Sequence, residues 1–249
     1  MAAVALLELS QFEYDSALSP RRYAASPMHL PALIEFLEGL SKNNNRPWFV
    51  LHKPAYDILR EEFLTLTTGL IEDVRKFDRD LGPVEPKKSA LRIYRNLRFS
   101  RDKTPFKTNM ACAIGDRAQR GFKPAYYFHI DANGILLAGG GIYQPDKTIL
   151  NNIRRNIADH PERLTRVLKN ARFRKTYKAL AEEESLSRPP KGFAPDLKHI
   201  DAIRMKHFFG IVEMDVRKRA PKNLRAHIAG LFHDVHPLVA YLREASQPQ

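Results

Sequence analysis

The feature that most constrains the fold is a change in hydrophobic period between residues 77 and 109. Residues 56–77 place apolar side chains at the spacing of one helix face, which predicts a long amphipathic helix. The apolar stripe consists of Leu59, Phe63, Leu66, Leu70, Val74 and Phe77. After the turn-rich stretch 78–88, residues 109–114 and 124–131 are predicted to be strands. The chain must therefore build helices and a sheet around a shared core.

A hairpin and further helices complete the pattern. Asn133-Gly134 lies between two apolar runs and supplies the two positive-φ residues of a type I′ turn, which predicts a β-hairpin. Helical spacing returns after Pro145 and continues through the segment RKTYKALAEE. Residues 207–216 predict a late strand, and residues 222–244 predict a last helix.

The order of these elements predicts the fold class. Helices, strands, helices, one strand and a final helix indicate an α+β protein in which helices pack on a mostly antiparallel sheet. Residues 29–245 are expected to form a single domain, because no long flexible linker interrupts them. Residues 1–28 are expected to be a poorly structured N-terminal extension. The loop 43–46 between the first two helices is polar enough to contact a ligand.

The composition is that of a basic protein. Lys and Arg number 41 against 28 Asp and Glu, and the formal net charge is +13. This surplus favours a phosphorylated metabolite, nucleic acid or an anionic membrane surface as partner, although a basic protein without such a partner has the same composition. Cys112 is the single cysteine, which excludes an intrachain disulfide and a cysteine-built zinc site. No apolar run approaches the roughly 20 residues that span a bilayer, so a cytoplasmic location is expected, with a eukaryotic organelle or the nucleus as open alternatives.

Residues 91–107, LRIYRNLRFSRDKTPFK, concentrate positive charge. In a strand, alternate side chains face opposite ways. The apolar face then consists of Leu91, Ile93, Leu97 and Phe99, and the polar face of Arg92, Tyr94, Asn96 and Arg98. Guanidinium, phenol and amide groups together suit carboxylate or phosphate oxygens, and Lys103 and Lys107 are expected near the end of the strand. The alternative is a solvated basic face.

Arg95 is different, because it falls on the apolar face of the same strand. An unpaired buried charge costs several kcal/mol, so a guanidinium there needs a partner. The predicted partners are the acids on or just after the long helix, namely Glu62, Asp73 and Asp78. Asp102, in the turn SRDKTP, is instead expected to accept hydrogen bonds from backbone amides.

These segments resemble an uncharacterised family, the domain of unknown function 2461. The resemblance runs from about Leu30 to Leu242, and the basic segment is close to the family pattern R-x-x-R-D-x-R-F-S-x-D-K-T-P-Y. Asn96 stands where the family usually has Asp, and Phe106 where it usually has Tyr. If that Asp is a base or a metal ligand, Asn96 abolishes the role; if it orients an arginine, Asn96 partly substitutes. The resemblance implies no particular reaction.

A glycine run is the second candidate site. Gly139, Gly140 and Gly141 are expected to follow a strand and to lead into the next helix, where backbone amides attract anions. Arg154, two turns into that helix, is expected to face the same cleft. The alternative is a glycine-rich strand crossing or bulge. No metal site is expected, because the His and Asp pairs lack an H-E-x-x-H pattern.

Three functions remain open from the sequence. The first is a site for a phosphate- or carboxylate-bearing ligand, and its residues are Arg92, Tyr94, Asn96, Arg98, Lys103, Lys107, Gly139, Gly140, Gly141 and Arg154. The second is nucleic-acid binding by a broad basic surface made of residues 91–107, 172–178 and 217–225. The third is a non-enzymatic interaction scaffold whose arginines are tied into internal ion pairs. Whether a ligand is converted chemically is left open.

Overall fold

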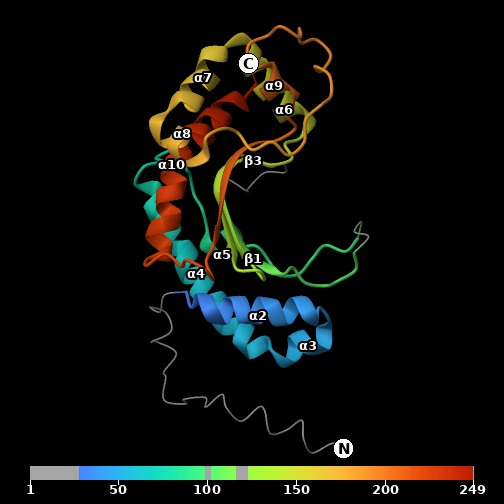
Figure 1. Cartoon of the computed structure of the whole chain (residues 1–249), viewed down its shortest axis with the longest axis vertical. Coiled ribbons are helices and arrows are strands. Elements are labelled where there is room, and N and C mark those ends of the chain that lie inside the picture. The colour runs from blue at the N-terminus through green and yellow to red at the C-terminus, as the bar shows by residue number, and fades with distance from the viewer. Residues whose placement is uncertain (1–27, 99–101, 116–122, 249) are drawn as a thin grey trace, which may run out of the picture.

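The computed structural model describes residues 28–98, 102–115 and 123–248 and has an α+β architecture (Figure 1). The strands are β1 (Asn109–Ile114), β2 (Ala125–Asp131), β3 (Ile135–Ile142) and β4 (Phe208–Asp215). The helices are α2 (Leu30–Lys42), α3 (Arg46–Leu51), α4 (Lys53–Arg75), α5 (Pro86–Ser89), α6 (Lys147–Asp159), α7 (Pro161–Lys169), α8 (Ala171–Tyr177), α9 (Ile200–Arg204) and α10 (Leu224–Ala245). The predicted fold class is confirmed. The predicted N-terminal extension lies outside the described residues, apart from Met28.

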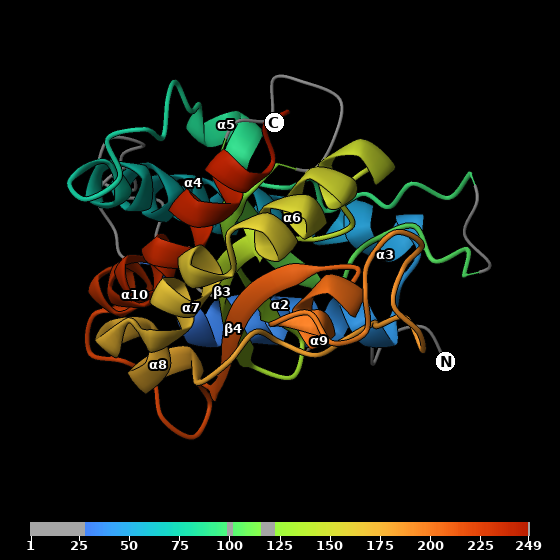
Figure 2. The same cartoon turned by 90° about the horizontal axis from the view of Figure 1, so that it is seen from above.

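The four strands form one antiparallel sheet in the order β1-β2-β3-β4. On one face, α4 and α10 run side by side (Figure 1, Figure 2). Phe63 of α4 packs against Phe128 of β2, with 5.2 Å between the ring centroids. Buried side chains from α2 through α10 form one continuous core with the sheet, so the described residues make a single α+β domain.

The other face of the sheet lines the inside of a C-shaped chain (Figure 1). In β2, the partly exposed Tyr127, His129 and Asp131 alternate with buried residues that face the helices. We call the side of the sheet that carries Tyr127 and His129 the open face. In the part of the chain that the structure describes, every helix is too short or too polar to cross a membrane.

The β2–β3 hairpin has a different turn from the predicted one. Gly134 has a φ of 75°, whereas Asn133 does not have the positive φ that a type I′ turn requires. The backbone amide of Gly134 donates to the Asp131 carbonyl at 3.0 Å. The Asp131 carboxylate accepts hydrogen bonds from the amides of Asn133 and Ile135 at 2.9 and 2.8 Å. This carboxylate stabilises a three-residue loop that ends in a left-handed glycine, and the type I′ prediction is wrong.

The helix predicted through RKTYKALAEE ends early. α8 stops at Tyr177, and Lys178 has a φ of 63°. The amide of Ala181 then donates to the carbonyl of Phe209 at 2.8 Å, so the chain runs along the outer edge of β4. This segment pairs with backbone groups at the edge of β4. A longer α8 would have left those groups without hydrogen-bond partners from this segment.

Four polar side chains, Asp78, Tyr126, His236 and Arg243, meet in the core, and we call them the Asp78 cluster. Asp78 is 1% exposed and accepts from both terminal nitrogens of Arg243, at 3.0 and 2.8 Å, and from the Tyr126 hydroxyl at 2.8 Å. Burial alone raises the pKa of Asp78, but the hydrogen bonds from Arg243 and Tyr126 outweigh it and lower that pKa. The cluster ties the end of α4 to β2 and α10.

Candidate functional site

The basic segment is an extended arm, not a regular strand. We define the basic arm as residues 91–98 and 102–107; the predicted apolar position Phe99 lies outside the described residues. The arm folds back on itself, since the amide of Arg95 donates to the Pro105 carbonyl at 2.9 Å and that of Lys107 to the Ile93 carbonyl at 2.7 Å. Pro105 has no N–H to donate, and the pairing is limited to isolated bridges such as that of Tyr94 with Phe106.

The two predicted faces of the arm are confirmed by burial. Ile93 is buried, whereas Arg92, Tyr94, Asn96 and Arg98 are exposed. Arg92 forms no ion pair with another described residue. The polar face is therefore a row of solvent-facing groups.

Asn44 and Phe49 hold the base of the arm. The Asn44 amide group donates to the Phe106 carbonyl and accepts from the Phe106 amide, both at 3.0 Å. The Phe106 ring stacks on Phe49 of α3, with 4.2 Å between the centroids. Buried backbone groups are costly to leave without partners, so one asparagine side chain fixes the position of this part of the arm.

Arg95 is paired within the arm. Its guanidinium forms an ion pair with Asp102 and donates to the Thr104 hydroxyl at 2.7 Å. The Thr104 amide and the Arg95 guanidinium together lower the pKa of Asp102 to about 2. The predicted ion pair exists, but the predicted partners on α4 are wrong. They are engaged elsewhere, Asp73 with Arg225, Asp78 with Arg243 and Glu62 with the backbone amide of His29.

Asn96 and Lys103 also make contacts inside the arm. The Asn96 carbonyl oxygen accepts from the backbone amide of Arg98 at 3.3 Å. The Lys103 ammonium donates to the Leu97 carbonyl at 3.2 Å. A carboxylate can accept the same hydrogen bond as an amide oxygen, so Asn96 performs a turn-stabilising role that does not require an acid.

A hollow of about 380 Å³ lies between the arm, the end of α2 and the start of β1. Its lining residues are Ser41, Asn44, Arg95, Asp102, Thr104, Phe106, Lys107, Thr108 and Asn109. Of the predicted site residues, the lining contains Lys107. The side chains of Thr108 and Asn109 make no hydrogen bond with other described residues, so their polar groups are available to a ligand. We call this space the arm hollow.

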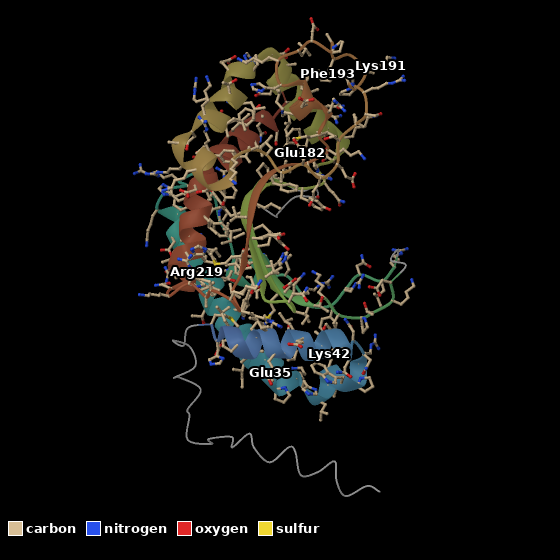
Figure 3. The ribbon with its side chains drawn as sticks, in the orientation of Figure 1. Glu35, Lys42, Glu182, Lys191, Phe193 and Arg219 are labelled. Carbon is tan, nitrogen blue, oxygen red and sulfur yellow. The ribbon has the colours of Figure 1, made fainter. Side chains whose placement is uncertain are left out.

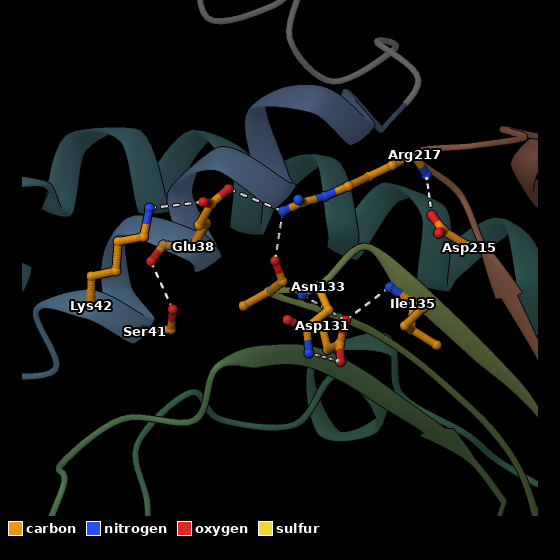
Figure 4. Close-up of polar contacts among 9 residues, drawn as sticks. Glu38, Ser41, Lys42, Asp131, Asn133, Ile135, Asp215 and Arg217 are labelled. Carbon is orange, nitrogen blue, oxygen red and sulfur yellow. Dashed lines mark hydrogen bonds and ion pairs between the residues drawn. The ribbon is translucent and has the colours of Figure 1, made fainter.

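The wall of the arm hollow is tied to the β2–β3 hairpin (Figure 4). Glu38 of α2 pairs with Lys42 at 2.8 Å and with Arg217 at 3.0 Å. Arg217 also donates to the Ala132 carbonyl at 2.8 Å, and Ser41, which lines the hollow, donates to the Glu38 carbonyl at 2.8 Å. These contacts connect α2 to the hairpin next to the hollow.

The glycine run lies inside β3 and not in a turn before a helix. Gly139 pairs with Tyr127 on one side and Ile211 on the other, so it belongs to the interior of the sheet. A Cβ on Gly139 would lie 1.9 Å from the Gly210 carbonyl oxygen, and one on Gly140 would lie 2.9 Å from Val235 and Val239 of α10. The glycines therefore permit close approach of β4 and α10, and the predicted turn of backbone donors is wrong.

Arg154 lies away from the arm. It is buried in α6 and donates to the Met205 carbonyl at 3.1 Å. A second hollow, of about 510 Å³, adjoins α6 and is lined by Asn151, Arg155, Ala158, Asp159, Lys191, Gly192, Phe193, Ala194 and Leu197. Figure 3 shows Lys191 and Phe193 at the opposite end of the molecule from Lys42 and Glu35. The structure does not bring Arg154 and the basic arm to one cleft.

Sequence reasoning missed most of the hollow. Ser41, Thr108 and Asn109 carry no motif and come from segments that meet only in the fold. The polar loop 43–46 was the one signal that pointed to Asn44. Among the residues described, no group of three or more His, Cys, Asp or Glu could hold a metal ion.

The comparisons with known proteins identify the family. A family model described as "Conserved hypothetical protein (DUF2461)" matches residues 32–241, and the chain belongs to this family. No curated protein and no solved structure matches the chain.

Proposed function

We propose that this protein binds a small phosphate- or carboxylate-bearing molecule in the arm hollow. The observation that carries the proposal is the pair of uncommitted side chains, Thr108 and Asn109, next to the cationic Lys107. A hydroxyl, an amide and an ammonium are the donors that anionic oxygens accept. Arg95 adds a guanidinium whose orientation is held by Asp102 and Thr104.

The exposed face of the arm supports the same ligand class. Arg92, Arg98 and Lys103 carry positive charge beside a hollow whose described lining has one acid, Asp102. That acid is already paired with Arg95, so it repels an incoming anion less than an isolated carboxylate would. A local excess of positive charge raises the association rate of anions, and this effect decreases as the salt concentration rises. We assign Arg92 and Arg98 this attracting role at the rim.

The broad nucleic-acid surface has less support. Helix α8 and Arg219, in the loop after β4, lie on the opposite side of the view from the arm (Figure 1, Figure 3). Arg217 is paired with Glu38, and Arg225 with Asp73. Cations that are separated and internally paired do not make the continuous stripe that tracks a phosphate backbone.

The test is calorimetric titration of the full chain with inorganic phosphate and with citrate at low salt. Lys107→Gln is expected to weaken phosphate binding about tenfold or more, because it removes a charge-assisted hydrogen bond. Lys222→Gln is the matched control, since it removes the same group from the exposed loop after β4. It is expected to leave the affinity unchanged.

The double variant Arg92→Glu, Arg98→Glu separates the three functions. Intact folding with lost phosphate binding supports the proposal. Lost folding would favour a scaffold in which the arginines are structural. A normal phosphate affinity together with a shallower salt dependence of binding to single-stranded or duplex DNA would favour nucleic acid. Arg219→Glu provides the same reversal of charge away from the arm.

A further inference from the structure

The open face carries a hydrogen-bonded pair of rings, Tyr127 and His129. The Tyr127 hydroxyl and the His129 Nδ1 atom are 3.1 Å apart, and both side chains are half-buried. Their ring centroids are 5.6 Å apart in an edge-on arrangement. Neither side chain packs into the core with α4 and α10, and neither lines the arm hollow.

The strand register places this pair next to the arm hollow. Asn109, which lines the hollow, pairs with Asp131, and the next positions on the same face are Ala111 with His129 and Ala113 with Tyr127. Two residues along a strand span about 7 Å. The row that contains His129 is therefore about 7 Å from Asn109, and the row that contains Tyr127 about 13 Å.

The neighbours of the pair on β1 are small. They are Ala111, which is 3% exposed, and Ala113, which is partly exposed, and on β3 Tyr127 pairs with the buried Gly139. Because Ala111 and Gly139 are covered, a ligand anchored at Asn109 would contact the two partly exposed rings and not the backbone between them.

His129 offers a hydrogen-bonding atom to such a ligand. Its Nδ1 is engaged by Tyr127, while Nε2 makes no hydrogen bond with another described residue. Burial lowers the pKa of His129, and the carboxylates of Asp131 and Glu213 oppose this effect. The net result is an imidazole that is neutral near neutral pH, with one nitrogen left for a ligand.

Nearby carboxylates indicate which part of the ligand lies there. Glu213 is exposed and lies in the row of His129, two strands away, whereas the Asp131 carboxylate, opposite Asn109, accepts hydrogen bonds from the amides of Asn133 and Ile135. An anionic group placed over His129 would be repelled by Glu213, whereas a hydroxyl or amide would not. The anionic end therefore belongs in the arm hollow and the uncharged body on the open face.

We propose that the open face around Tyr127 and His129 is the second half of the ligand site and that it binds the uncharged, hydroxyl- or amide-bearing body of a phosphomonoester. This inference rests on the proposed function, because the arm hollow supplies the anchor for the phosphate. The ligand is thus a sugar phosphate or a nucleotide, and not a bare inorganic anion. Tyr127 is a positioning residue that holds the imidazole in place.

The test compares inorganic phosphate, ribose 5-phosphate and adenosine 5′-monophosphate on the full chain. Ribose 5-phosphate is expected to bind about tenfold more tightly than phosphate, through one or two added hydrogen bonds. His129→Gln and Tyr127→Phe are expected to remove this gain and to leave phosphate affinity unchanged. A variant that merely loosened the fold would lower the affinity for both phosphate and ribose 5-phosphate. Adenosine monophosphate binding more tightly than ribose 5-phosphate identifies a nucleotide, and equal affinity identifies a sugar phosphate.

Nuclear magnetic resonance of the His129 ring supplies a readout in the unmodified protein. Its ring signals are expected to shift with ribose 5-phosphate and not with phosphate. Equal affinity for phosphate and ribose 5-phosphate, with the His129 signals unmoved, would overturn this inference and leave the proposed function standing if Lys107→Gln still weakens phosphate binding. No binding of either ligand to the unmodified chain would overturn both.

Discussion

The Asp78 cluster and the basic arm use the same chemical groups in opposite ways. In the core, Asp78 is 1% exposed and accepts hydrogen bonds from two side chains that lie far away in the sequence, Tyr126 and Arg243, as well as from the nearby Asp80 amide. In the arm, Arg95 pairs with Asp102, while Arg92 and Arg98 are exposed to solvent. The arginine of the cluster holds the fold together, whereas we propose that the exposed arginines of the arm attract a ligand.

The comparison shows why counting arginines is a poor guide to function. A buried carboxylate needs its partner, because removing one member leaves an uncompensated charge. An exposed ion pair contributes little to stability, since water and salt screen it. The cluster is expected to respond to mutation through stability, and the arm through binding.

The largest expected effect is on the cluster. Asp78→Ala leaves Arg243 and Tyr126 without their shared acceptor and is expected to reduce the free energy of unfolding by about 3–5 kcal/mol. Urea denaturation measures this loss. Asp57→Ala is the matched control, because it removes an acid from an exposed pair with Lys53, and it is expected to change stability by less than about 1 kcal/mol. Similar losses in the two variants would remove the distinction between buried and exposed pairs.

The next effect tests how the arm is attached. Asn44→Ala removes both hydrogen bonds from the backbone of Phe106 and is expected to cost about 1–3 kcal/mol. Hydrogen exchange of the Phe106 amide should increase in the same variant. Asn43→Ala, which removes an exposed contact with the Gly39 carbonyl, serves as the control. Unchanged exchange at Phe106 would mean that Asn44 does not hold the arm.

A pH titration examines the ion pair inside the arm. The pKa of Asp102 is lowered to about 2, first by the Thr104 amide and then by Arg95. The pair's contribution to stability is therefore present above about pH 4, the ordinary range of an aspartate, and is lost as the pH falls through about 2. Arg95→Met is expected to raise the pKa of Asp102 but to leave it below its ordinary value, as followed by the carboxyl carbon resonance. A pKa that did not move would exclude the ion pair in solution.

The smallest effect concerns Asn96, the position at which the resemblance described above implies an acid. Asn96→Asp keeps an acceptor for the Arg98 amide, so the free energy of unfolding is expected to change by less than about 0.5 kcal/mol. A loss of more than about 1 kcal/mol would show that the amide group of Asn96 has a structural role of its own. Thermal denaturation of the unmodified protein and of the Asn96→Asp variant measures this change.

Local patterns predicted the elements well. The helical stripe from Leu59 to Val74 became α4, and the predicted strand at 109–114 is β1. The alternation around Ile93 also predicted which arm residues face solvent. These features depend on side-chain spacing along one segment, which the sequence contains directly.

Contacts between distant segments were not predictable in the same way. The arm hollow exists because Asn44 reaches Phe106, 62 residues later in the chain. The glycine run was predicted as a turn before a helix or as a strand crossing, but the reason for Gly139 is the close approach of Gly210 on β4. Arg95 took Asp102 as its partner because the arm folds back on itself, and alternation alone cannot show such a reversal.

The most direct test of the central claim is a phosphate titration followed by the side-chain amide signal of Asn109. Binding in the arm hollow predicts that this signal shifts with a saturable dependence on phosphate, and that Lys107→Gln weakens the response while Lys222→Gln does not. A saturable shift confined to residues around Lys191 and Phe193, with Asn109 unmoved, would contradict it.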